Sequence, residues 1–176
     1  MPKKHKLKLY PDRVLRQKAK PVIDLDGDLH NFISRMAKLM YENHGIGLAA
    51  PQLGMLQRIV MADIGEGLLT LINPVIIEQE GQDRFEEDCL SLPGIRVQID
   101  RNFTILVQGV DTEGTIKQIE LNGMMSRIIQ HEIDHLNGVL IIDYASVAEK
   151  FFLKEKLEQH RREYFNSLDK INKSQL

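Results

Sequence analysis

The segment HEIDH at residues 131–135 constrains this chain more than any other part of its sequence. It lies within residues 123–137, where apolar residues recur at helical spacing until an Asn-Gly pair ends the pattern. Because residues four apart share one face of a helix, His131 and His135 can bind one metal ion, with Glu132 beside it as a base. Two unrelated surface histidines are the less favoured interpretation, since this helix is strongly amphipathic and well bounded.

The third metal ligand is not evident from this segment. A catalytic metal site has about three protein ligands and one open position. The metzincin continuation HExxHxxGxxH fails, because position 141 is Ile. Two candidates remain: Cys89, in the turn-rich segment 87–94, and Glu155, which would give a zinc endopeptidase. Spacing alone does not choose between them.

A second segment, GIGLAAPQLG at residues 45–54, is rich in small residues. Small residues let another backbone or a ligand approach closely. The main chain of Gly47 can then pair with an extended substrate, and Gln52 offers an amide donor that can polarise a carbonyl group. From physics alone, a tight helix-to-strand connection with a buried amide at Gln52 is slightly favoured.

Composition narrows the class of protein. The chain has 176 residues without repeats or linkers, so we expect one catalytic domain over residues 1–176. Its formal net charge of -2 argues against DNA or RNA binding by bulk charge, and no apolar stretch is long enough for a membrane span. The single cysteine, Cys89, cannot form an internal disulfide. These features favour a cytoplasmic protein that binds neither DNA nor membrane.

The expected fold is α+β, with antiparallel or mixed β-sheets packed around the central HExxH helix. We expect an extended start at residues 1–25, a core over about residues 6–145, and a frayed tail at 167–176. Predicted helices cover residues 26–44 with Asp26 or Asp28 as N-cap, 123–137, and 147–165. Predicted strands cover residues 58–63, 68–72, 75–79, 102–110, 115–121 and 139–144.

Three segments together resemble the peptide deformylases. They are GIGLAAPQLG at 45–54, EDCLSLPG at 87–94 and QHEIDHLNG at 130–138, in the order of that family's motifs. The sequences around Tyr10-Pro11-Asp12 and Ile72-Asn73-Pro74 are also similar. The resemblance runs from about residue 6 to about residue 145, and three motifs in order make it specific.

The resemblance implies a reaction and a role for each motif residue. The implied metal ligands are Cys89, His131 and His135, with water or hydroxide in the fourth position. That water would attack the formyl carbon of an N-formylmethionyl nascent peptide, with Glu132 as general base, and formate would leave. Gln52 and the main-chain N–H of Leu90 would bind the developing oxyanion.

The resemblance also implies how substrate and metal are chosen. The main chains of Ile46 and Gly47 would pair with the peptide. A methionine side chain needs an unbranched apolar pocket, and the candidate lining residues are Ile46, Phe85, Met125 and Ile128. The family favours Fe²⁺ in the cell, with Zn²⁺, Ni²⁺ or Co²⁺ as substitutes.

Two further features concern this chain in particular. Asp88 stands where the family usually has Gly, and Asp is among the few residues that tolerate a positive φ. We therefore expect activity to be retained, with an altered metal preference. The predicted C-terminal helix carries basic residues that can form a face toward ribosomal RNA, although a solvated helix is an equally favoured interpretation; they are Lys150, Lys154, Lys156, Arg161 and Arg162.

Overall fold

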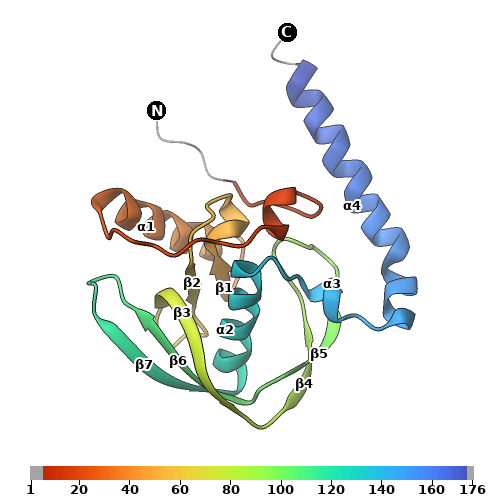
Figure 1. The fold of residues 1–176 in the computed structure, drawn as a ribbon. Helices are drawn as coiled ribbons and strands as arrows, with labels where there is room; N and C mark the ends of the chain where they lie inside the picture. The colour runs from red at the N-terminus through yellow and green to blue at the C-terminus, as the bar shows by residue number, and fades with distance from the viewer. Residues whose placement is uncertain (1–5, 174–176) are drawn as a thin grey trace.

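A computed structural model describes residues 6–173, with side chains up to Asp169. The helices are α1 (Gly27–Glu42), α2 (Gly123–Leu136), α3 (Ile141–Tyr144) and α4 (Val147–Lys173), with 3-10 turns η1 (Arg13–Arg16) and η2 (Ala50–Leu53). The strands are β1 (Gly47–Ala49), β2 (Ile59–Ala62), β3 (Leu69–Glu80), β4 (Asp83–Glu87), β5 (Val97–Arg101), β6 (Thr104–Val110) and β7 (Ile116–Asn122). The predicted α+β class is confirmed (Figure 1).

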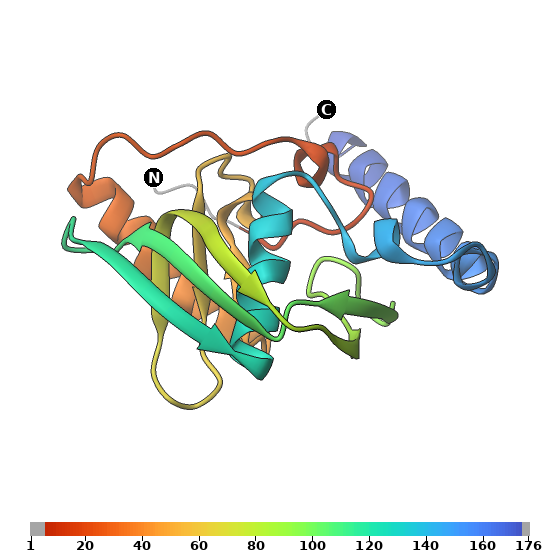
Figure 2. The same cartoon turned by 60° about the horizontal axis from the view of Figure 1, so that its bottom comes forward.

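The strands form two antiparallel sheets on either side of α2 (Figures 1 and 2). The larger sheet has the order β1-β2-β3-β6-β7, and the smaller one consists of β4 and β5. Apolar residues of α2 pack on one face of the larger sheet, and α1 packs on strands β1 to β3 from the other side. Strand β1 lies at the edge of its sheet, so one side of it is free of strand partners.

The helix predicted at 26–44 is present as α1. Its N-cap is Asp26, whose Oδ1 accepts a hydrogen bond of 2.8 Å from the N–H of Leu29. The chain leaves the helix at Asn43, and His44 then adopts a positive φ of 55°. None of the helices in residues 6–173 has the length and hydrophobicity needed to cross a membrane.

The strands predicted at 68–72 and 75–79 are one strand, β3, and their separation was wrong. Asn73 has a φ of 53° and falls where the register between β3 and β6 shifts. The Asn73 side chain bonds both the N–H and the carbonyl of Val22, which holds this irregularity in place. Pro74 lacks an N–H and is tolerated in the sheet because it lies at the bulge.

Two predictions near the C-terminus were also wrong. Residues 139–144 contain the short helix α3 instead of a strand, because the Asp143 side chain accepts from Leu140 N–H and pairs with Arg16. A short buried apolar run does not distinguish helix from strand. The predicted frayed tail at 167–176 is helical through Lys173. Residues 174–176, like 1–5 of the predicted extended start, lie outside the described residues.

A buried carboxylate joins the smaller sheet to α2. Glu87 Oε1 accepts hydrogen bonds of 2.8 Å from Arg101 Nε and from Arg127 Nη1. Arg101 also donates to Asp134 on α2, at 2.6 Å. Burial alone would raise the pKa of Glu87, but hydrogen bonds from Arg101 and His131 outweigh it and lower that pKa to about 2.

We expect Glu87→Gln to destabilise the protein by about 3–5 kcal/mol, because two buried guanidinium groups would lose their shared counter-charge. Denaturant unfolding measures this loss. The matched control is Glu86→Gln, the exposed neighbour that pairs with Arg96 at the surface, for which the expected loss is below about 1 kcal/mol. Equal losses in the two variants would contradict the role assigned to Glu87.

The Glu87 carboxylate also makes the free energy of unfolding depend on pH under acidic conditions. Because folding lowers the pKa of Glu87 from 4.5 to about 2, its contribution is complete above pH 4.5 and is lost as pH falls toward 2. The free energy of unfolding should therefore fall less steeply over this range in Glu87→Gln than in the parent.

Gly138, just after α2, is required for close packing. A Cβ at this position would lie 2.6 Å from the carbonyl oxygen of Arg16, and its φ is +74°. We expect Gly138→Ala to be at least about 2 kcal/mol more destabilising than Gly65→Ala, because backbone atoms cannot give way. Gly65 is the control, since its φ is +98° but no atom lies within 4 Å of an added Cβ. Similar unfolding free energies for the two variants would rule out the steric argument.

Candidate metal centre

Three potential ligand atoms converge from two distant segments. The ligand atoms of Cys89, His131 and His135 all lie within 4.8 Å of one another, and Cys89 Sγ is 3.2 Å from His135 Nε2. The two histidines come from one face of α2, as the i, i+4 spacing predicts. Glu155, the alternative third ligand, is exposed on α4 and does not join this group.

The donor set fits a transition metal. One thiolate and two imidazoles suit zinc, iron, nickel and cobalt, and three ligands leave an open position. His131 Nδ1 lies 2.9 Å from Glu87 Oε2, so its Nε2 is the atom left for a cation. His135 Nδ1 and Glu132 Oε2 are buried and have no hydrogen-bond partner among the described residues. The chain therefore holds a cluster that can bind a metal.

Burial and charge tune the groups of this centre. Burial lowers the pKa of His135 well below its ordinary value, which favours the neutral imidazole that a metal requires. Burial alone would also lower the pKa of His131, but hydrogen bonding to Cys89 and Glu87 raises it well above its ordinary value. A proton and a cation therefore compete for His131. Burial raises the pKa of Glu132 to about 7.

A glycine brings β1 against the face of α2 that carries Ile128 and Glu132. A Cβ on Gly47 would lie 2.4 Å from Glu132 Oε1 and 2.6 Å from Ile128 Cγ2. Only a residue without a side chain permits this approach. At Gly47, β1 therefore lies directly against Glu132.

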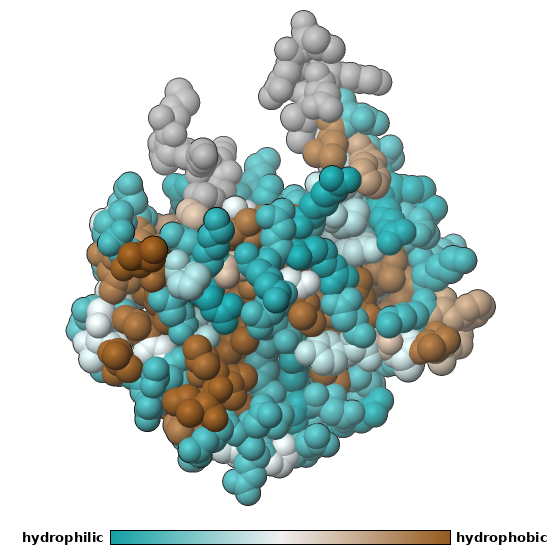
Figure 3. Space-filling view, viewed as in Figure 1, coloured by the Kyte–Doolittle hydropathy of each residue, from teal (hydrophilic) through white to brown (hydrophobic). Residues whose placement is uncertain are grey.

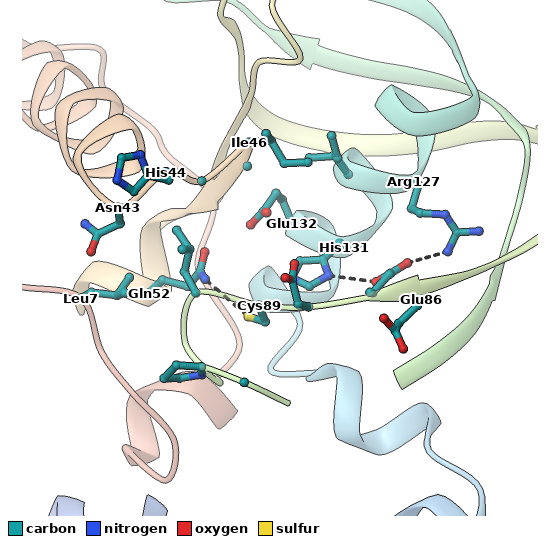
Figure 4. A pocket seen from close by; sticks show the side chains of 18 of the residues that line it. Leu7, Asn43, His44, Ile46, Gln52, Glu86, Cys89, Arg127, His131 and Glu132 are labelled. Carbon is teal, nitrogen blue, oxygen red and sulfur yellow. Dashed lines mark hydrogen bonds and ion pairs between the residues drawn. The ribbon is translucent and has the colours of Figure 1, made fainter. Parts of the chain in front are cut away.

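Gln52 and Leu90 lie beside the cysteine. Gln52 is buried; its Oε1 accepts from Ala49 N–H at 2.8 Å, which directs Nε2 toward Ser91 Oγ at 3.2 Å and Cys89 Sγ at 3.8 Å. The amide thus presents its donor side to the cluster (Figure 4). Leu90 N–H takes part in none of the turn hydrogen bonds described for this loop.

One cavity of about 750 Å³ is bordered by Gly47, Gln52, Cys89, Leu90, His131 and Glu132. Ile46, Phe85 and Ile128 line it as predicted. Met125 does not line it, and its prediction as a pocket residue is not supported: it packs against the core instead, and Met124 lines the cavity. Figure 4 shows Gln52, Cys89, His131 and Glu132 around the same space.

Asp88 is accommodated without backbone strain. It lines the cavity, is exposed, and is not among the described residues with a positive φ. This position therefore does not depend on the conformational freedom of glycine here.

Sequence reasoning missed the support of His131 and part of the cavity wall. Leu7 and Leu9 of the N-terminal segment line the cavity, and nothing in their local sequence indicates this. Arg127 also contacts Glu87, and it precedes His131 by four residues on α2. That spacing is a signal that could have placed both side chains on one carboxylate.

Comparisons with known proteins agree with the geometry. Residues 4–151 match the family described as "Polypeptide deformylase". A peptide deformylase of Thermodesulfovibrio yellowstonii is 41% identical over 157 residues, which cover 86% of this chain and 95% of that protein. The crystal structure of a peptide deformylase from Legionella pneumophila has 36% identity and a TM-score of 0.85, covering 90% of this chain and 95% of that one. That of Thermotoga maritima has 45% identity and a TM-score of 0.79, covering 81% and 97%. The chain belongs to the polypeptide deformylase family, and it is a hydrolase.

Proposed function

We propose that this protein removes the N-terminal formyl group from N-formylmethionyl peptides of newly made polypeptides and releases formate. The observation that carries the proposal is the buried Oε2 of Glu132, which has no hydrogen-bond partner in residues 6–173 and lies beside the Cys89, His131 and His135 cluster. A buried carboxylate without a partner is costly unless water or substrate completes its bonding. Its position next to three metal-ligand side chains supports hydrolysis of an amide.

Cys89, His131 and His135 would hold one divalent ion, which we propose to be Fe²⁺ in the cell with Zn²⁺, Ni²⁺ or Co²⁺ as substitutes. When bound, such an ion polarises a carbonyl oxygen and makes water a stronger acid. Asp88 adds a carboxylate at the cavity wall, and we propose that it alters the preference among these metals.

The free edge of β1 would bind the substrate main chain. An extended peptide can add to an unpaired strand through main-chain hydrogen bonds. The exposed Ile46 and the adjoining Gly47 border the cavity and are the residues that would pair with the peptide. Phe85, Met124 and Ile128 would then enclose the methionine side chain.

Glu132 would accept the proton of the attacking water and pass it to the leaving amine. Burial raises its pKa above that of an exposed carboxyl group, which favours uptake of a proton from water. Gln52 Nε2 and Leu90 N–H would donate to the oxygen that gains negative charge, each contributing about 3 kcal/mol. A formyl carbon carries only hydrogen, so a tight site can exclude larger acyl groups.

Glu132→Gln should retain the metal but lose formate release from a formyl-Met peptide by about 10²-fold or more, because proton transfer is lost. The matched control is Glu155→Gln, which should leave both metal content and formate release unchanged. Loss of metal in the control would favour the alternative, an HExxH zinc endopeptidase with Glu155 as ligand. Undiminished formate release from Glu132→Gln would exclude the proposed mechanism.

We also propose that the protein works in the cytoplasm on nascent peptides, with α4 as a contact to the ribosome. Lys156 and Arg161 contact the domain, whereas Lys150, Lys154 and Arg162 are exposed and are the basic residues that would contact ribosomal RNA. Substituting these three residues by Ala should weaken cosedimentation with ribosomes at low salt. Unchanged cosedimentation would rule out the contact.

A further inference from the structure

We propose that α4 positions the metal-binding loop, residues 89–95, through Lys156, His160 and Arg161. These would be positioning residues, because they touch the loop and its neighbours and not the reacting atoms. The inference rests on the proposed metal centre, and it adds that a helix outside the HExxH core controls how Cys89 is presented.

The first contact runs from Arg161 through Tyr10. Arg161 donates to Tyr10 OH from Nη2 at 2.9 Å and from Nε at 3.2 Å. The main-chain N–H of Tyr10 donates to Ser91 O at 2.9 Å, and Ser91 Oγ accepts from Gln52 Nε2. One series of hydrogen bonds therefore links α4 to the loop and to the proposed oxyanion donor.

The second and third contacts hold the loop directly. His160 Nε2 lies 3.0 Å from Pro93 O, and since a carbonyl only accepts, the ring nitrogen is the donor. Lys156 Nζ donates to Gly94 O. The approach is close, because a Cβ on Gly94 would lie 3.3 Å from Lys156 Nζ.

The loop passes these restraints on to Cys89. Its turns are closed by hydrogen bonds from Leu92 N–H to Cys89 O at 2.9 Å and from Ile95 N–H to Leu92 O at 3.0 Å. On the inner side, Leu153 and Leu157 of α4 pack against the apolar cluster that contains Cys89, Leu92 and Ile95. The loop that begins with Cys89 therefore lies between His135 on α2 and the supporting residues of α4.

The chemistry of metal binding makes such support matter. Ligands must be held within roughly 0.5 Å of productive geometry, and groups that orient them typically change metal affinity about 10–100-fold. Cys89 is the one ligand of the three that comes from a loop, whereas α2 fixes both histidines. The position of its sulfur is therefore the least determined by secondary structure.

The test uses the full chain with Lys156, His160 and Arg161 all replaced by Ala. Cys89 is the single cysteine, so iodoacetamide alkylation of the metal-free protein reports how often the loop exposes it. We expect alkylation about 10-fold faster than in the parent, and release of bound Zn²⁺ to a chelator faster by a similar factor. The matched control replaces Gln159, Glu163 and Asn166 by Ala, three exposed residues of α4 for which no contact with the loop is described.

Several outcomes decide the proposal. The control should alkylate and release Zn²⁺ at the parent's rates, and His160→Gln, which keeps an N–H donor, should stay closer to the parent than His160→Ala. Equal rates of alkylation and Zn²⁺ release in the control and in the variant that lacks Lys156, His160 and Arg161, whether slow or fast, would overturn the proposal. If the triple variant does not fold, the single variant Arg161→Ala must still accelerate alkylation, and parent-like alkylation overturns the inference.

The two proposals fail in different ways. A parent protein that binds Zn²⁺ but releases no formate would refute deformylation and leave the role of α4 intact. Conversely, if the parent releases formate but the variant without Lys156, His160 and Arg161 is alkylated at the parent's rate, only the role of α4 is refuted.

Discussion

The candidate metal centre depends most on the interactions of the Glu87 carboxylate. This carboxylate accepts from Arg101 and Arg127 through buried hydrogen bonds and lies against Nδ1 of His131. The Glu87 carboxylate therefore joins the small sheet to α2 and neutralises buried guanidinium charge. It also determines which ring nitrogen of His131 faces Cys89 and His135. Buried ion pairs of this kind add little net stability over apolar packing, but removing one partner is costly. We interpret the network as a device that orients the site more than as a source of stability.

The centre also requires very close approach between elements that have no sequence proximity. Gly47 lets β1 run against Glu132 and Ile128, and Gly138 lets the end of α2 meet the backbone at Arg16. Gly47, Cys89, His131 and Glu132 all border a single cavity. Figure 3 shows that hydrophobic side chains are also exposed away from that cavity, at the start of α4, where Val147, Phe151 and Phe152 are 88%, 75% and 80% exposed.

Much of this arrangement could be predicted from local sequence pattern, because the helical period determines α1, α2 and the shared face of His131 and His135. The position of Cys89, and not Glu155, beside the two histidines could not be predicted from local pattern, because it depends on how a loop folds back onto α2. Only the family resemblance indicated it. Strands β1, β4 and β5 were not predicted: β1 has three residues and β4 is largely polar, so neither shows a clear period. Met124 and Met125 differ by one helical step, about 100° of rotation, and pattern reasoning chose the wrong one for the cavity.

The short length of β1 has a consequence for how the protein behaves at high concentration. An open strand edge invites pairing between copies, and proteins limit that hazard by keeping such edges brief or irregular. Of the two edge strands of the larger sheet, β1 spans only Gly47–Ala49 and is followed at once by a 3-10 turn that contains Pro51. Three residues fall short of the roughly six that stable self-stacking segments need. The opening that would admit a peptide is thus too brief to seed aggregation.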